Sequence, residues 1–369
     1  MSKQFNSFFA VTPPGFEPVC AHELDRLGLT DVHLLAGGVE FSGGLQELYL
    51  ANLWLRSAGR VLVRVGNVQA RDFPTLYKRL LRLPWGSFIK PGTDPVIRAT
   101  CHRSRLSHSG RVAETCQQAI RKALGAAESS SMQAAIYLRL EDDRCQVSID
   151  STGDLLHRRG YRQANVAAPL RENLAAGCLL TLGYDGSVPL IDAMTGSGTF
   201  AIEAALIARN LAPGAARKFA FMGWPKYRSG LWNQLLLEAQ QAERPALESI
   251  LAIDSNPKAI IAAQKNMEAA HLFDDIALHC QRIQELSPPQ VSGLIICNPP
   301  YGERLGRTAA LQALYKDLGR IYGETFSSWR GAMVCPDSAL ARSTGVPFTA
   351  TIRFSNGGIR VALLEKQQK

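Results

Sequence analysis

The sequence lacks a long apolar segment. None of its hydrophobic runs approaches the ~18 uncharged residues that a membrane-spanning helix requires. The first six residues, Met1 to Asn6, contain no hydrophobic region of the kind found in a signal peptide. These absences predict a globular protein that acts in the cytoplasm and has no membrane partner.

Cysteine pairs at metal-binding spacing are also absent. The cysteines are scattered, with no C-x-x-C pair and no histidine cluster beside them, so the sequence suggests neither a metal site nor a disulfide framework. We interpret them as reduced thiols of the protein core. The eight positions are Cys20, Cys101, Cys116, Cys145, Cys178, Cys280, Cys297 and Cys335.

The most informative feature that is present is Asn298-Pro299-Pro300-Tyr301, which follows the apolar run 294–297. The two prolines cannot continue a strand because they lack an N–H group. The Asn298 side chain and a proline carbonyl are then free to accept hydrogen bonds beside the flat ring of Tyr301. This combination suits a planar base that carries an exocyclic amine. A turn that merely ends a strand is the alternative interpretation.

A second signal is a glycine-containing loop between an expected strand and an expected helix. The apolar residues 189–191 lead into Asp192-Ala-Met-Thr-Gly-Ser-Gly-Thr199, and a helical apolar pattern follows at 200–207. Glycines let the backbone approach a ligand closely, and a helix N-terminus offers N–H groups to an anion. A dinucleotide-binding loop is the competing interpretation, but it requires an acidic residue ~20 residues further on. The next acid at a strand end is Asp254, much further along the chain.

Asp254 ends the apolar run 250–253, where its carboxylate could bind both ribose hydroxyls of a nucleoside cofactor. Asp192, Asp254 and Asn298 are thus three polar residues at three expected strand ends. Open α/β sheets bind their ligands at the carboxyl ends of the strands. The pattern therefore predicts an α/β domain with these groups gathered at one site.

These motifs resemble those of the class I S-adenosylmethionine-dependent amino-methyltransferases, whose fourth motif is Asn/Asp-Pro-Pro-aromatic. Residues 157–162 (HRRGYR) and 168–176 (APLRENLAA) are similar to the start of the catalytic domain in the THUMP-domain RNA methyltransferases. The resemblance covers almost the whole chain, and it is greatest to bacterial enzymes that make N2-methylguanosine in 23S ribosomal RNA. Stretches that resemble the first domain of that family lie at 12–17, 22–24, 37–41, 51–56 and 84–85.

The resemblance implies a domain order. It consists of a ferredoxin-like α+β domain (residues 1–65), a THUMP RNA-binding domain (66–152), a linker (153–168) and a Rossmann-like α/β class I methyltransferase domain (169–369). The pattern of apolar residues agrees with it. It predicts strands at 8–11, 39–41, 61–65, 96–99, 135–140 and 145–150, helices at 19–27, 45–53, 73–81 and 112–124, and a C-terminal hairpin of strands 349–354 and 359–364 on an Asn-Gly turn.

The resemblance also implies the reaction, which is methyl transfer from S-adenosylmethionine to N2 of a guanine in RNA, with 23S ribosomal RNA favoured. Transfer RNA and N6 of adenine stay open, because the motif cannot distinguish the two amines. A ribosome-assembly factor that binds RNA without turnover is the third possibility. The catalytic residues implied are Asn298, Pro299, Pro300 and Tyr301. The residues implied for the cofactor are Asp192, Thr195, Gly196, Ser197, Gly198, Thr199 and Asp254.

One segment departs from the family pattern. Family members usually carry an acidic residue a few positions before the leucine that precedes the fourth strand, where it contacts the adenine amino group. Residues 279–286 read HCQRIQEL and place no carboxylate there. Gln281 can accept the same hydrogen bond through its amide oxygen, whereas Arg282 has no acceptor.

Positive charge is concentrated in the N-terminal half. The chain has a net charge of +9, and the stretch from Leu55 to Lys122 alone contains 14 Lys/Arg and 3 Asp/Glu. Phosphate neutralisation supplies most of the sequence-independent affinity for a polynucleotide, so this stretch is a candidate RNA surface. A solvated basic face is the alternative for any single residue. The candidate RNA contacts are Arg103 and Arg105 in the loop 102–110, and Arg158, Arg159 and Arg162 at the domain joint.

Overall fold

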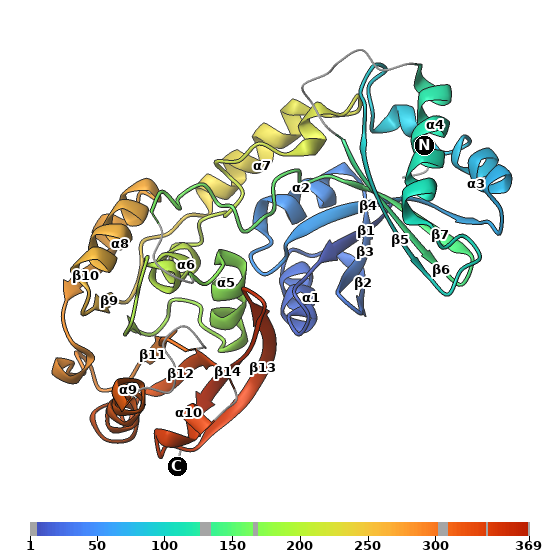
Figure 1. Cartoon of the computed structure of the whole chain (residues 1–369). Helices are drawn as coiled ribbons and strands as arrows, with labels where there is room; N and C mark the ends of the chain where they lie inside the picture. The colour runs from blue at the N-terminus through green and yellow to red at the C-terminus, as the bar shows by residue number, and fades with distance from the viewer. Residues whose placement is uncertain (1–5, 126–133, 165–168, 302–308, 337–338, 368–369) are drawn as a thin grey trace.

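The computed structural model describes residues 6–125, 134–164, 169–301, 309–336 and 339–367. Two seven-stranded sheets organise these residues, one in each half of the chain (Figure 1). No helix in the described ranges is long and apolar enough to cross a membrane. The last four residues of the predicted linker, 165–168, lie outside the described residues.

The N-terminal sheet has the strand order β2-β3-β1-β4-β7-β6-β5, in which β5 and β6 are parallel and the other neighbours antiparallel. Four helices pack their apolar sides against this sheet in one hydrophobic core. The strands are β1 (Asn6–Val11), β2 (Thr30–Leu35), β3 (Gly38–Gly43), β4 (Arg60–Gln69), β5 (Val96–His102), β6 (Ala135–Glu141) and β7 (Arg144–Asp150). The helices are α1 (Glu17–Arg26), α2 (Leu45–Trp54), α3 (Phe73–Leu80) and α4 (Ser109–Leu124).

Strand β4 runs through the boundary that the resemblance implies between residues 65 and 66. Its first part, Arg60–Val63, pairs with β1, and its longer part, Leu62–Gln69, pairs with β7. The two units predicted on either side of this boundary therefore share one continuous sheet and one core. Every strand and helix expected in this half overlaps an observed element. Strand β2 was not expected; it is an edge strand with little buried surface.

The C-terminal sheet has the order β10-β9-β8-β11-β12-β14-β13, which is the expected Rossmann-like α/β arrangement. The first five strands in this order are parallel, and β14 is antiparallel to both of its neighbours. The strands are β8 (Leu190–Asp192), β9 (Ile250–Asp254), β10 (Ile276–Cys280), β11 (Leu294–Cys297), β12 (Arg330–Cys335), β13 (Phe348–Asn356) and β14 (Ile359–Lys366). The helices are α5 (Glu172–Thr181), α6 (Thr199–Ala208), α7 (Ser229–Gln241), α8 (Pro257–Ala269), α9 (Ala309–Arg320) and α10 (Ala339–Ser343).

The predicted C-terminal hairpin is confirmed, with a shifted turn. Asn356 pairs with Ile359, so the two central turn residues are Gly357 and Gly358 rather than an Asn-Gly pair. Both glycines have positive φ, +57° and +87°, as a tight two-residue hairpin turn requires. The shift matters for the site described below, because it leaves Asn356 at the end of β13 with its side chain free to reach Tyr301.

The two halves of the chain interlock. Phe16 from the N-terminal half packs on Phe354 of β13, with ring centroids 5.1 Å apart. In the opposite direction, Phe221 from the C-terminal half stacks on Tyr49 of α2 at 4.4 Å. Arg56 donates hydrogen bonds to carbonyl oxygens of the C-terminal half at 3.2 and 2.7 Å. These contacts fix the N-terminal sheet against the domain that contains the candidate site.

Candidate active site at the carboxyl ends of the strands

The three polar strand ends lie on adjacent strands of the C-terminal sheet. Strand β8, which ends at Asp192, is the neighbour of both β9, which ends at Asp254, and β11, which leads into Asn298. In the register of these parallel strands, Asp192 lies opposite Ala252 and Ile296. The sheet therefore brings the three predicted side chains to one edge, as expected for a ligand site of an open α/β sheet.

Asp192 is a buried carboxylate with one free oxygen. Its Oδ2 accepts hydrogen bonds from Thr195 Oγ1 at 2.7 Å and from the Ala201 N–H at 3.3 Å. Its Oδ1 is buried and has no hydrogen-bond partner among the described residues. Burial disfavours the charged form and raises the pKa of Asp192 to about 7. An unpaired buried carboxylate oxygen of this kind fits a cationic group of a ligand.

The loop 195–199, which we name the glycine loop, connects β8 to α6 and turns on two residues with positive φ. Gly196 has φ +56°, and Gly198, which caps α6, has φ +86°. Asp254 holds this loop, because its Oδ2 accepts from the Gly196 N–H at 3.0 Å and its Oδ1 from the Asn256 N–H at 2.9 Å. The structure thus joins two of the predicted cofactor elements by a direct hydrogen bond.

The Asn298-Pro-Pro-Tyr301 motif lies at the end of β11 and combines a free acceptor with a fixed ring. Asn298 Oδ1 is buried and, within the described part of the chain, has no hydrogen-bond partner. Tyr301 is half-buried, and its hydroxyl accepts a hydrogen bond from Asn356 Nδ2 at 3.1 Å. The hairpin residue thereby anchors the ring next to the acceptor. The residues that follow the motif, 302–308, lie outside the described residues.

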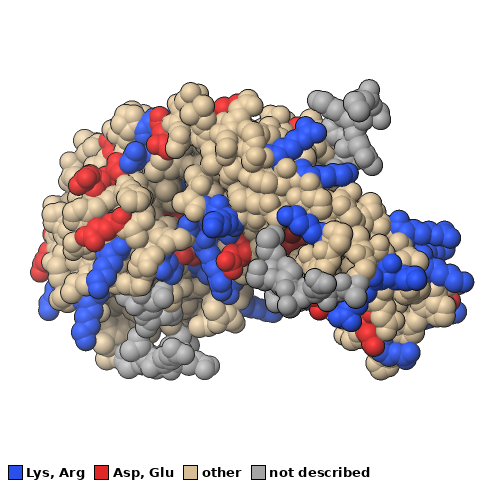
Figure 2. Space-filling model, turned by 90° about the horizontal axis from the view of Figure 1, so that it is seen from above, with Lys and Arg blue, Asp and Glu red and all other residues tan. Residues whose placement is uncertain are grey.

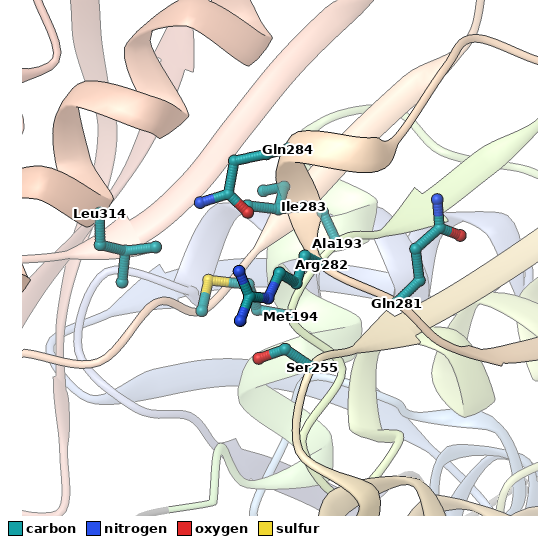
Figure 3. A pocket seen from close by; sticks show the side chains of 8 residues that line it. All are labelled: Ala193, Met194, Ser255, Gln281, Arg282, Ile283, Gln284 and Leu314. Carbon is teal, nitrogen blue, oxygen red and sulfur yellow. The ribbon is translucent and has the colours of Figure 1, made fainter.

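A pocket with a volume of about 160 Å³ opens beside the ends of β8, β9 and β10 (Figure 3). Its lining combines apolar and polar side chains: Ala193, Met194, Ser255, Gln281, Arg282, Ile283, Gln284 and Leu314. The side chain of Gln281 is directed away from the other labelled side chains (Figure 3). Gln281 Nε2 donates to the Glu285 carbonyl at 2.9 Å. In this conformation the Gln281 amide does not face the pocket, so its predicted adenine contact remains a proposal.

The predicted RNA contacts divide into exposed and buried arginines. Arg103 and Arg105 are exposed in the loop after β5, and Arg103 forms ion pairs with Glu141 and Asp142 at 3.1 and 3.4 Å. Arg158 is also exposed and pairs with Asp154 at 3.1 Å. Figure 2 shows Lys and Arg side chains gathered at the right-hand end of the molecule, where Figure 1 places α3 and α4. The basic stretch therefore does reach the surface.

Arg159 is buried and Arg162 is half-buried, and both bind internal acceptors; the RNA contacts predicted for them stay predictions. Arg159 is 6% exposed, donates to the Arg56 carbonyl at 2.6 Å and lies 3.5 Å from Glu203. Arg162 bonds residues of the glycine loop and of α5. The motif HRRGYR has the composition of an exposed basic patch, and a charge count cannot show which of its arginines turn inward.

Two further residues near the site were missed. Asn266 on α8 is fully buried and donates to the Ser197 carbonyl of the glycine loop at 2.9 Å. Glu203 on α6 is fully buried and accepts from Tyr161 at 3.0 Å. Each of these residues is a polar residue among apolar neighbours of its helix. That pattern in the sequence could have identified both as buried hydrogen-bonding residues.

The described residues contain no cluster of His, Cys, Asp and Glu that could hold a metal ion. The cysteines are free thiols, and all are buried except Cys101 and Cys280. The polar groups of the site instead fit an organic, partly cationic ligand. They comprise a free carboxylate oxygen on Asp192, a second carboxylate on Asp254 and a pocket lined by Met194 and Ile283. An S-adenosylmethionine molecule has an ammonium group, a ribose and an adenine that match these three features in turn.

Comparison with known families decides the assignment. Residues 159–349 match the family described as RMKL-like, methyltransferase domain, and residues 7–62 match the RlmL ferredoxin-like domain. The chain belongs to the RlmKL-like methyltransferases. Members of this family use S-adenosylmethionine, so this RlmKL-like protein is an S-adenosylmethionine-dependent methyltransferase.

Relatives of similar length and longer relatives both match this RlmKL-like chain. A protein of Synechocystis sp. named "Putative RNA methyltransferase slr0064" is 34% identical over 97% of this chain and 96% of its own length. The "Ribosomal RNA large subunit methyltransferase K/L" of Syntrophotalea carbinolica is 35% identical over 97% of this chain, but only 53% of its own length is covered. The chain thus spans about half the length of the K/L relatives. The crystal structure of SMU.472 complexed with SAH has 30% identity and a TM-score of 0.90 over 100% of this chain and 99% of its own.

Proposed function

We propose that this protein methylates an exocyclic amino group of a base in RNA, and that the favoured target is N2 of a guanine in 23S ribosomal RNA. The observation that carries the proposal is the buried, unpartnered Oδ1 of Asn298 beside the anchored ring of Tyr301. The names of the relatives support an RNA substrate, and the K/L names support ribosomal RNA of the large subunit.

The proposed roles follow from the chemistry of the amine. Its lone pair is delocalised into the base, so the nitrogen is a poor nucleophile. S-adenosylmethionine, when bound, supplies an activated methyl group. Asn298 Oδ1 and the Pro299 carbonyl accept hydrogen bonds from the amine and stabilise the positive charge that develops on nitrogen. Tyr301 stacks on the extruded base and holds the nitrogen in line for transfer, a contact worth ~1–3 kcal/mol. The methylated nitrogen then loses its proton to solvent, so we assign no general base.

The cofactor roles use the groups that the site leaves free. Asp192 Oδ1 faces the ammonium of the methionine part, the glycine loop wraps that part, and Asp254 binds the ribose hydroxyls with its remaining lone pairs. The pocket beside Met194 accepts the adenine. Gln281 reaches the adenine only if its side chain leaves the Glu285 carbonyl, so the backbone is the nearer candidate in this conformation.

The proposal is tested by mapping the product. RNA from a strain that lacks the gene is incubated with the protein and S-adenosylmethionine labelled with tritium in the methyl group. Large ribosomal RNA and transfer RNA are then separated and digested to nucleosides. We expect label in N2-methylguanosine from 23S RNA, and labelling slower by ~10² or more with the Asn298→Ala variant. Label in N6-methyladenosine or in transfer RNA would correct the target, and no transfer to any RNA would contradict the proposed function.

A further inference from the structure

Arg162 makes an unusually complete set of hydrogen bonds at the glycine loop. It belongs to residues 158–164, which lead from the N-terminal sheet toward α5 and which we name the junction segment. Its guanidinium donates to four acceptors, and the side chain is 17% exposed. The acceptors are Glu172 Oε1 (2.7 Å), the Leu170 carbonyl (2.9 Å), Thr199 Oγ1 (3.0 Å) and Ser197 Oγ (3.2 Å).

Two of these acceptors are the hydroxyls that flank Gly198 in the glycine loop. Ser197 is 3% exposed and Thr199 5% exposed, so neither side chain is solvated enough to fix itself through water. A loop that turns on two glycines with positive φ has little conformational preference of its own. The planar guanidinium binds both hydroxyls at once and so sets the distance between them.

A second residue ties the same loop to the same segment. Asn266 Nδ2 donates to the Ser197 carbonyl at 2.9 Å, and Asn266 Oδ1 accepts from the N–H groups of Gln163 and Ala164 at 2.8 and 2.9 Å. The junction segment is thus linked to the glycine loop in two ways. Arg162 binds two side chains of the loop directly, and Asn266 of α8 connects the backbone of the segment to the backbone of the loop. Asp254 binds the same loop at the Gly196 N–H.

We propose that Arg162 is a positioning residue for the cofactor. By holding Ser197 and Thr199, it keeps the glycine loop in the conformation in which the free oxygen of Asp192 and the carboxylate of Asp254 face the same ligand. The inference rests on the cofactor site proposed above. It replaces the RNA contact that the sequence suggested for this arginine, because the guanidinium uses four of its five N–H donors on internal acceptors and has little exposed surface for a phosphate.

The test compares the affinity for S-adenosylhomocysteine, measured by calorimetry, in four variants. Arg162→Ala removes all four bonds, whereas Arg162→Lys keeps a positive charge beside Glu172 but cannot reproduce the planar fork. Arg209→Ala is the matched control, since Arg209 also pairs with a carboxylate, Asp275 at 2.8 Å, but at the opposite end of α6. Asp254→Ala tests the cofactor site itself.

We expect Arg162→Ala to weaken the affinity about 10- to 100-fold, since it removes two bonds from a charged donor to the loop. Arg162→Lys should recover part of this loss, and Arg209→Ala should stay within about twofold. In turnover assays, Arg162→Ala should raise the KM for S-adenosylmethionine while kcat at saturating cofactor changes little. RNA affinity and its salt dependence should match the unsubstituted protein. If the role of Arg162 were purely structural, Arg162→Ala would instead lower the melting temperature, and it would not raise the KM for S-adenosylmethionine selectively over its effect on kcat.

Each contrary outcome is informative. If Asp254→Ala weakens binding and folded Arg162→Ala does not, the positioning role is overturned and the cofactor site stands. If neither weakens binding, the site itself is wrong. If Arg162→Ala loses RNA affinity with cofactor affinity intact, Arg162 is an RNA contact after all. Should Arg162→Ala fail to fold, Thr199→Val removes one acceptor without a change of shape, and unchanged cofactor affinity in that variant overturns the proposal.

Discussion

The buried carboxylate of Asp192 makes cofactor binding depend on pH in a way that the structure specifies. Burial is the largest cause of its raised pKa of about 7, and the neighbouring charge of Asp254 adds to it, whereas the hydrogen bond from Thr195 opposes it. In the free protein, Asp192 is therefore mostly protonated below pH 7 and mostly ionised above it. A bound ammonium at its free Oδ1 favours the ionised form and lowers the pKa.

The sign and size follow from proton linkage. Below pH 7 the cofactor must displace a proton from Asp192, so affinity should rise by nearly tenfold per pH unit well below the pKa and by about 50-fold in all from pH 5 to pH 7. Above pH 7 the affinity should level off. The cofactor's own ammonium titrates only from about pH 8, so the window from pH 5 to 7 reports the carboxyl group.

Calorimetry of S-adenosylhomocysteine binding across pH 5–8, in two buffers of different ionisation enthalpy, measures both the affinity and the protons released. Asp192→Asn is the control, because its amide cannot titrate. It should bind weakly with a flat profile between pH 5 and 7, and it should release no proton. An unsubstituted protein with a flat profile, or an Asn variant with the same slope, would refute the proposed contact between Asp192 and the ammonium.

Three further predictions concern other parts of the site and the RNA surface. Asp254→Ala should weaken S-adenosylhomocysteine binding by ~1.5–3 kcal/mol in calorimetry, because it removes a charged acceptor that also holds the Gly196 N–H; unchanged affinity in a folded variant would remove the ribose assignment. Replacing Arg103 and Arg105 together by Ala should weaken binding of all RNA sequences alike and reduce the slope of log K against log salt by roughly 1–2, and an unchanged slope would make them a solvated loop. Tyr301→Phe should lower kcat by about tenfold at most, since it loses one hydrogen bond to Asn356 and keeps the ring; a loss as large as that of Tyr301→Ala would contradict the stacking role.

The sequence predicted the parts of the fold that apolar periodicity controls. The glycine loop, Asp254 and the Asn298 motif were found because each follows an apolar run, and parallel strands necessarily gather their ends at one edge. Strand β2 was missed because its polar–apolar alternation, Asp31 to Leu34, spans only four residues of an almost fully exposed edge strand. The continuity of β4 could not be anticipated either, since a strand that belongs to two units has no composition change at their boundary.

The environment of individual polar side chains was harder to predict. Arg158, Arg159 and Arg162 lie within one basic motif, yet one is exposed and two are turned inward, toward Glu203 and the glycine loop. Which arginine finds an internal acceptor depends on residues distant in sequence, such as Thr199, that only the fold brings near. Gln281 similarly bonds a local carbonyl instead of facing the pocket, because a short-range hydrogen bond is available to it.

The most direct test of the central claim is the rate of methyl transfer by Asn298→Ala at saturating cofactor, measured in a single turnover on RNA that the unsubstituted protein methylates. The amide acts mainly on charge that develops at the amine in the transition state, so we expect the rate to fall by ~10² or more while S-adenosylhomocysteine affinity is nearly unchanged. Methylation of the RNA at the normal rate would show that the motif is only the turn that ends β11, and would contradict the assignment of this site as an amino-methyltransferase centre.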